Sequence, residues 1–445
     1  MKNLSFNLFL ASLFLMSCTP DQPQTVFSNV NVIPMNSDQI LENQTVVVEG
    51  DRIVDIGSAS DISFSSNVTI IDGTDKFLMP GLAEMHGHVP PTDPGENAPD
   101  YFDDEYVEST LFLYISAGIT TVRGMLGYEN QLTLKDRVNS GEIIGPHLYL
   151  AGPSFNGNTI SSPEQAAQRV QEHKEEGWDL LKVHPGLSLE QYDAMAETAH
   201  EVGITFGGHV PADVGVIHAI ESGQITIDHV DGYVNYLREF DDSEMEDKLA
   251  EVIQLTKEND VWIVPTMALW ETIIGAADYE AMKKYDELKY IPEAVKQNYF
   301  NFADNPQSAY STDNPQEHAE LRRKILEEMN NAGVKILMGT DAPQLFSVPG
   351  FSIHRELPHM KASGMNNYEI IQSGTKNVGD YFSEWDDFGT IQEGQRADLI
   401  LVNGNPLEDL SVIQDHSGVM VQGKWYSREM IDEKLNEIEE YYSNE

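Results

Sequence analysis

The sequence predicts an α/β protein: a (β/α)8 TIM barrel with a small composite β-sandwich built from its N- and C-terminal flanks. Two observations predict the barrel. Residues 80–388 contain eight short apolar segments, and amphipathic helical stretches lie between them. A third observation concerns the flanks, 26–79 and 389–427, where β-branched runs are separated by Gly, Asn and Asp. Because the two flanks share this sequence pattern, we predict that both ends of the chain form one domain.

The eight expected strands follow one another along the barrel segment. In chain order they are 82–89, 118–125, 146–153, 179–186, 203–210, 224–230, 261–267 and 334–343. Several of the stretches between them open with a capping Ser or Asn and close on Gly, which is typical of α-helices. The clearest of these are 162–177, 188–203 and 314–333.

Two further segments are expected to be helical. Residues 268–313 are too long for a simple loop, and their aromatic, amphipathic pattern predicts either a lid over the barrel mouth or a contact between copies in a homo-oligomer. The sequence does not distinguish the two. The C-terminal helix, 428–445, is expected to be a solvated acidic cap.

The N-terminus has the pattern of a targeting segment. A basic start and an apolar stretch within residues 1–17 indicate a signal peptide, and "LMSC" resembles the lipobox of bacterial lipoproteins. This resemblance implies that Cys18, the only cysteine, is lipidated, that 18–25 is a linker, and that the protein is anchored in the bacterial cell envelope, at the outer membrane or facing the periplasm. The alternative is an ordinary cleaved signal with an incidental cysteine.

The charge balance restricts the partners. The chain has 27 Lys+Arg against 73 Asp+Glu, a formal net charge of −46. Such a surface repels nucleic acid and anionic lipid, so we expect no nucleic-acid partner and membrane contact only through the lipid anchor. The acidity is spread along the chain, which fits either a salty habitat or a merely acidic protein.

Polar side chains gather at the expected strand ends. His86 and His88 end the first strand, and residues two apart in a strand project from the same face. Since the C-terminal ends of barrel strands meet at one mouth, the further strand-end residues are expected to lie beside them. These are Lys182 and His184 on the fourth strand, His209 on the fifth, His229 on the sixth and Asp341 on the eighth. One such residue alone has an ordinary structural explanation, but the set favours a metal site.

The segments "PGLAEMHGHV", "LLKVH", "GGHV", "TIDHVDG" and "MGTDAP" resemble the successive strand-end motifs of the amidohydrolase superfamily. The resemblance implies a binuclear centre in which His86, His88 and Asp341 hold one divalent ion and His209 and His229 the other. Lys182 would bridge the ions as a carbon dioxide-derived carbamate, because a desolvated lysine amine has a lowered pKa. Imidazole and oxygen donors favour zinc and admit manganese or cobalt.

The implied chemistry is hydrolysis of an amide-like carbon–nitrogen bond. Two ions would activate a bridging water and polarise the substrate carbonyl, with Asp341 as the group that accepts the proton and passes it to the leaving nitrogen. A mononuclear deaminase is disfavoured, because Ala212 stands where that branch usually carries a glutamate. A lactone or phosphoester hydrolase would use the same metals, and a non-catalytic binding lipoprotein would be expected to have lost a ligand.

The segments "GHVP", "DHVDGYVNYL" and "TDAPQLFSVPGFSIHREL" resemble a subgroup with Xaa-Pro dipeptidases and enzymes of the imidazolonepropionase type. The implied substrate is a dipeptide or an N-acyl amino acid, or else a cyclic amide. Tyr233, His184 and His354 are then candidates to line the substrate pocket. The candidates to bind a substrate carboxylate are Arg123, Arg238 and Arg355. The sequence does not distinguish among these three arginines, and we take Arg123 as the candidate for binding the carboxylate.

Overall fold

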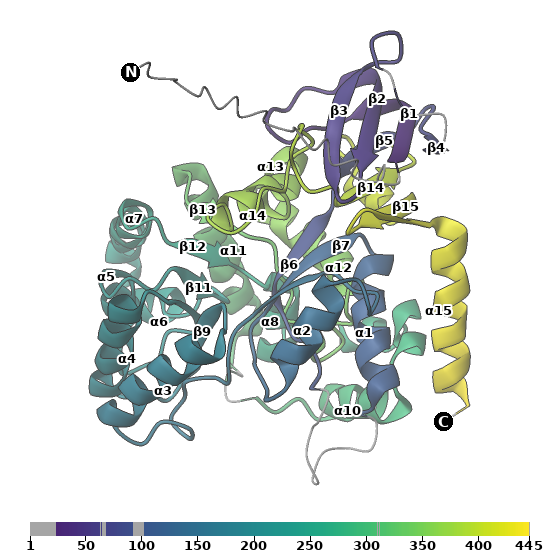
Figure 1. Ribbon diagram of the computed structural model, residues 1–445. Helices are drawn as coiled ribbons and strands as arrows, with labels where there is room; N and C mark the ends of the chain where they lie inside the picture. Colours follow the sequence, from purple (N-terminus) through teal and green to yellow (C-terminus); the bar gives the residue numbers. More distant parts are fainter. Residues whose placement is uncertain are drawn as a thin grey trace, which may run out of the picture.

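The computed structural model has a mixed α/β fold (Figure 1). It describes residues 24–62, 64, 68–91, 102–308, 310 and 312–444. Cys18, the predicted signal peptide and most of the predicted linker lie outside these residues. Within the described part of the chain, no helix is long and apolar enough to cross a membrane.

Strands from the two flanks share one sheet. Its strand order is β16-β15-β14-β5-β1-β2-β3, and β4 pairs with β1. From the N-terminal flank come β1 (Gln24–Val32), β2 (Leu41–Glu49), β3 (Arg52–Ser58), β4 (Val68–Asp72) and β5 (Phe77–Pro80). From the C-terminal flank come β14 (Leu399–Val402), β15 (His416–Val421) and β16 (Lys424–Ser427). The predicted sandwich is not confirmed, because β14 continues the sheet edge to edge beside β5.

Each of the eight expected barrel segments contains a strand. Three form one parallel sheet: β6 (Leu82–Gly87), β7 (Ile119–Gly124) and β8 (His147–Leu150). Five form a second: β9 (Leu180–Val183), β10 (Thr205–Gly208), β11 (Thr226–Asp228), β12 (Trp262–Val264) and β13 (Lys335–Ile336). Helices follow most of the strands, as expected of βα units.

Backbone contacts connect the two parallel sheets at both of their edges. Parallel bridges pair Ala151 with Leu180 and Phe155 with Val183, which joins the end of β8 to β9. On the other side the Met85 amide donates to the Met338 carbonyl at 2.9 Å, and the Asp341 amide donates to the His86 carbonyl at 2.7 Å. The ends of β6, β9 and the segment after β13 are therefore held close together.

The predicted caps are present at Ser162 and Ser188 and at the three C-terminal glycines, but Asn314 forms no capping hydrogen bond. In α3 (Pro163–Glu176) the Ser162 side chain accepts a hydrogen bond from the Gln165 amide, and Gly177 ends the helix at φ 94°. This left-handed conformation suits glycine, which has no Cβ to clash. The helices α4 (Leu189–Val202) and α11 (Pro315–Ala332) also end on a left-handed glycine. The remaining helices of the βα region are α1 (Asp104–Ser116), α2 (Gln131–Asn139), α5 (Val216–Glu221), α6 (Tyr233–Leu237), α7 (Asp242–Glu258), α12 (Phe351–Ala362), α13 (Asn367–Ser373) and α14 (Lys376–Tyr381).

The long segment after β12 is helical, as predicted. It contains α8 (Met267–Ile274), α9 (Tyr279–Met282), the 3-10 helix η1 (Asp286–Tyr290) and α10 (Glu293–Asp304). The last helix, α15 (Arg428–Ser443), differs from the solvated cap that we expected. Ile431, Leu435 and Ile438 are buried in an apolar cluster that includes Phe112 of α1. Only one face of α15 is therefore solvated.

Candidate metal centre

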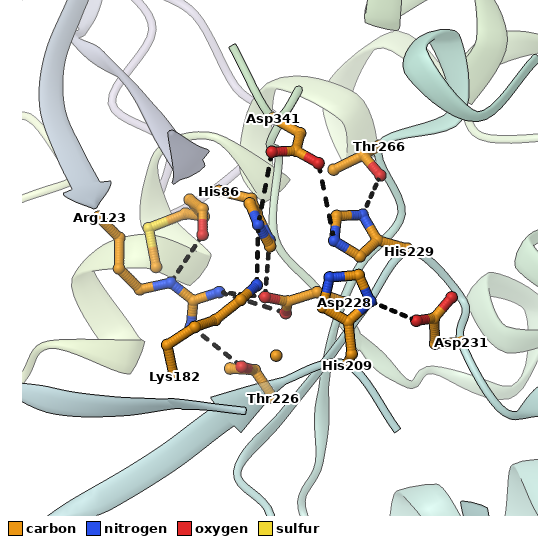
Figure 2. A network of polar contacts seen from close by, with 12 residues as sticks. His86, Arg123, Lys182, His209, Thr226, Asp228, His229, Asp231, Thr266 and Asp341 are labelled. Atoms are coloured by element: carbon orange, nitrogen blue, oxygen red, sulfur yellow. Dashed lines mark hydrogen bonds and ion pairs between the residues drawn. The ribbon is translucent and has the colours of Figure 1, made fainter. Parts of the chain in front are cut away.

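Five strand ends deliver buried polar side chains to one place (Figure 2). His86 lies in β6 and Lys182 in β9, and both are at most 1% exposed. His229 and Asp341 follow β11 and β13, and His209 follows β10. The ligand atoms of His86, His229 and Asp341 all lie within 4.8 Å of one another. The structure thus brings together the residues that were predicted to hold metal.

Short contacts connect these groups. Lys182 Nζ donates to His86 Nε2 at 3.0 Å, and Asp341 Oδ1 lies 3.7 Å from the same nitrogen. The other oxygen of Asp341 lies 3.8 Å from His229 Nε2. His88 Nε2 lies 2.5 Å from Asp341 Oδ1. Asp341 is therefore central to the cluster, between histidines from two different strands.

The opposite nitrogens of three imidazoles face oxygen acceptors. Asp228 Oδ2 lies 2.7 Å from His86 Nδ1, and Asp231 Oδ2 lies 2.6 Å from His209 Nδ1. Thr266 Oγ1 is hydrogen-bonded to His229 Nδ1 at 2.7 Å. This arrangement leaves the Nε2 atoms for a ligand, as is usual in metal sites. His229 Nε2 is buried and has no hydrogen-bond partner among the described residues, so the residues present fit a divalent cation.

Backbone strain is concentrated at the same positions. His229 has φ 62°, Asp341 has φ 63° and Thr266 has φ 45°, values that residues other than glycine rarely adopt. Each of these conformations costs of order 1–3 kcal/mol and persists only where the surrounding structure imposes it. The strained positions are therefore two proposed metal ligands, His229 and Asp341, and Thr266, which is hydrogen-bonded to His229.

Burial determines the protonation of the centre. It lowers the pKa of Lys182 to about 8, although Asp228 and Asp341 act in the opposite direction. Burial also holds the pKa of His86 and of His229 well below the ordinary histidine value. These two imidazoles are therefore neutral near pH 7, which is the form that binds metal ions.

The buried carboxylates Asp228 and Glu84 are functional residues that the sequence analysis missed. Asp228 contacts His86 from behind the centre. Glu84 accepts hydrogen bonds from the His86 amide at 3.0 Å and from the Thr340 amide at 2.7 Å, and burial raises its pKa to about 8. Glu84 thereby fixes β6 to the segment that carries Asp341. A carboxylate inside an apolar strand was the available signal in both cases.

Arg123, the candidate from the sequence for binding a substrate carboxylate, is not placed to do so. It is fully buried, its Nε donates to the Met85 carbonyl at 2.6 Å, and its Nη2 lies 3.3 Å from both oxygens of Asp228. The side chain points into the interior beneath the centre, where Asp228 neutralises it (Figure 2). Arg123 therefore supports the carboxylate that contacts His86 and does not reach the cavity.

Two other pocket predictions are wrong, and one residue is placed as expected. Tyr233 is 0% exposed, and its hydroxyl is hydrogen-bonded to Thr256 Oγ1 at 2.8 Å. It begins α6 and packs into the core. His354, on α12, lines a different cavity together with Arg355. His184 lines the cavity of the metal centre, and its ring stacks on His209 with centroids 5.0 Å apart.

A cavity of about 450 Å³ opens over the metal centre. Trp270 and Ile273 of α8 line it, as do Val295, Asn298 and Tyr299 of α10. The helical segment after β12 therefore covers the mouth, in the position expected of a lid. A role of this segment in contacts between copies stays a prediction.

The orienting role of Asp231 gives a first testable expectation. Asp231→Ala removes the acceptor of His209 Nδ1, and the loss of such a partner typically weakens metal binding by about 10–100-fold. Competition with a chromophoric chelator measures this affinity. The matched control is Asp193→Ala, which breaks a His–Asp contact of the same 2.6 Å length at the partly exposed His218. Equal metal affinity of the two variants would contradict the role assigned to Asp231.

Comparisons with known proteins agree with this centre. The model of the amidohydrolase family matches residues 77–426. An ochratoxinase from Aspergillus niger is 23% identical, over 94% of this chain and 88% of that protein. A 5-methylthioadenosine/S-adenosylhomocysteine deaminase from Caldanaerobacter subterraneus subsp. tengcongensis is 24% identical, over 85% and 84%. The solved structure of a Xaa-Pro dipeptidase with bound methionine superposes with a TM-score of 0.68 at 24% identity, covering 91% of this chain and all of that one.

Proposed function

The chain belongs to the amidohydrolase family and is a metal-dependent hydrolase of carbon–nitrogen bonds, and from this premise we propose that it cleaves the amide bond of a dipeptide or an N-acyl amino acid. One observation carries the proposal: the ligand atoms of His86, His229 and Asp341 lie within 4.8 Å beside a buried lysine, under a cavity of about 450 Å³. This volume suits a small substrate.

In the proposed site, His86, His88 and Asp341 would hold one divalent ion, and His209 and His229 would hold the other. Lys182 would supply an oxygen ligand to these ions as a carbamate, and its lowered pKa of about 8 supports this role, because only the neutral amine captures carbon dioxide. Zinc is the proposed metal. When bound, the ions supply Lewis acidity, which polarises the substrate carbonyl and lowers the pKa of a water molecule.

The chain's own residues perform the proton transfers. Asp341 is 6% exposed and adjoins both His86 and His229, so its carboxylate is placed to accept a proton at the centre and deliver it to the leaving nitrogen. The helices α8 and α10 line this cavity with mainly apolar side chains beside the centre. His184 faces the same cavity and is placed to contact the acyl portion of a substrate.

The same proposal covers the architecture and the location of the protein. The hydrogen bonds at both junctions of the parallel sheets support a closed (β/α)8 barrel. The lipobox-like "LMSC" supports lipidation at Cys18 and attachment to the bacterial envelope. An N-terminal lipid would leave the hydrolase domain exposed to small substrates in that compartment.

A substrate panel tests the proposed activity. The metal-loaded protein is offered Xaa-Pro and other dipeptides, N-acyl amino acids, cyclic amides, lactones and an adenosine deaminase substrate, and the products are separated chromatographically. We expect cleavage of dipeptides or N-acyl amino acids, and no deamination, because Ala212 cannot relay a proton. The proposal is wrong if the cyclic amides or lactones are cleaved and no linear amide is.

A further inference from the structure

A second cavity adjoins the cavity of the metal centre. Its volume is about 500 Å³, and Trp270 and Tyr310 line both cavities. The rest of its wall comes from the segment after β11, from α6 and from α11. The two cavities therefore meet at Trp270 and Tyr310, so the second cavity lies next to the position of a reacting bond beside His229.

A buried arginine without an ion-pair partner among the described residues lies in the wall of the second cavity. Arg322, on α11, is 3% exposed, and its guanidinium lies 4.0 Å from the centre of the Trp270 ring. It donates to the carbonyl oxygen of His229 and, through Nε, to His318 Nε2 at 3.4 Å. No carboxylate of the described residues lies within ion-pair distance of it.

Arg322 differs in this respect from the other buried arginines. Arg123 contacts Asp228, and Arg396 is 2.6 Å from Asp398. In a chain with 73 Asp+Glu against 27 Lys+Arg, carboxylates are abundant, so a buried arginine without one is unexpected. An unpaired buried charge is costly, and a bound anion would remove that cost.

Two hydrogen-bond donors near Arg322 lack acceptors among the described residues. His318 Nε2 accepts from Arg322, so the proton of this imidazole is assigned to Nδ1, and Nδ1 is buried without a partner in the described structure. Trp270 Nε1 is likewise buried and unpartnered there. Arg238, at the end of α6, is exposed and lines the same cavity. The local chemistry is that of an anion site.

Two carboxylates also line the second cavity, and neither offsets Arg322 at close range. Asp231 lies 2.6 Å from His209 Nδ1, and it attracts Arg322 only from beyond ion-pair distance. Asp313 is exposed to solvent at the rim, where water screens its charge. The positive charge of Arg322 and Arg238 therefore remains available to a ligand.

We propose that Arg322 and Arg238 bind the carboxylate of the substrate's leaving amino acid. The inference rests on the proposed amide hydrolysis and adds the residues that select for a free carboxylate. A planar guanidinium can bind a carboxylate through two parallel hydrogen bonds, which discriminates strongly against a neutral amide. Arg355, the remaining candidate from the sequence, is excluded because it binds Glu287 through two nitrogens.

The test measures binding, so that it does not depend on turnover. L-proline, L-phenylalanine and L-methionine, and the carboxamide of each, are titrated into the metal-loaded protein by calorimetry and by tryptophan fluorescence, to which Trp270 contributes. We expect the best of the amino acids to bind about 10–100-fold tighter than its amide, the equivalent of one or two charge-assisted hydrogen bonds. Arg238→Ala and Arg322→Lys should each remove most of this difference.

The control variant is Arg137→Ala, which removes an exposed arginine of α2 that pairs with Glu142 and should leave the difference unchanged. Thermal unfolding checks that each variant is folded. If Arg322→Lys is not folded, the binding result for Arg238→Ala alone tests the inference. The inference is overturned if no amino acid binds, if acid and amide bind equally, or if the variants keep the difference. Tighter, arginine-dependent binding of inorganic phosphate would replace the carboxylate assignment.

Binding and turnover separate the two proposals. If the substrate panel shows no linear amide cleavage while the amino acids still bind in an arginine-dependent way, the proposed function fails and the carboxylate site stands. If linear amides are cleaved while Arg238→Ala and Arg322→Lys bind the amino acids as the unmodified protein does, the proposed function stands and the carboxylate site fails.

Discussion

Asp341→Asn should bind metal and lose turnover. The amide oxygen of asparagine can still coordinate a cation, but the side chain cannot accept a proton. The rate of amide cleavage should therefore fall by about two to four orders of magnitude, the usual contribution of general acid–base catalysis. The measurement compares kcat with metal content, the latter determined by elemental analysis of the same sample.

Asp341→Asn has a matched control in Asp228→Asn, which changes a carboxylate that contacts His86 from behind the centre and lies away from the cavity lining. Here we expect a loss of metal affinity or of stability, because Arg123 loses its counter-charge, with turnover per bound metal closer to normal. Full turnover of Asp341→Asn at normal metal content would show that another group handles the proton.

Lys182→Ala should lose metal as well as activity. Lys182 Nζ lies 3.0 Å from His86 Nε2 in a fully buried position. Without the proposed bridging anion, two divalent charges repel each other without compensation, and occupancy should fall from about two ions per chain towards one. Elemental analysis measures the stoichiometry, and the loss of turnover should be at least as large as for Asp341→Asn.

Chemical rescue separates a bridging role of Lys182 from a merely structural one. Formate or acetate in solution can occupy the space that the side chain vacates, and it should restore part of both metal content and activity. Lys135→Ala is the control, because Lys135 forms an ion pair with Asp179 away from the centre and should respond to neither acid. If Lys182→Ala retained two ions and full activity, the bridging role and the two-metal mechanism would both be wrong.

The strand ends could be predicted from the sequence because their signal is local. An apolar run that closes on a polar residue, repeated along the chain, fixes both the strand and the end at which His86, Lys182 and His229 lie. The contacts behind the ligands could not be predicted in this way. Whether Arg123 reaches the cavity or the interior depends on the register of β7 beside β6, which only the tertiary structure sets.

Two errors have different physical origins. Tyr233 follows the sixth strand closely, but the chain turns immediately into α6, and this turn directs the ring to Thr256 in the core. For α15, the signal was present and was outweighed by the acidic composition. Ile431, Leu435, Ile438 and Tyr442 recur at helical spacing, which is the pattern of a helix with one buried face.

The pairing of β5 with β14 has a consequence for the order in which the protein is made. Met79 lies opposite Ile400, so β5, which also pairs with β1 and leads directly into β6, gains its second neighbour only when the ribosome has produced almost the whole chain. Contacts between such distant positions form late, because closing a long loop is entropically unfavourable. Asp341 and β14 both lie late in the sequence, so the cation site is complete only near the end of synthesis or after it. Metal can therefore bind to the complete site only at the end of synthesis or after it.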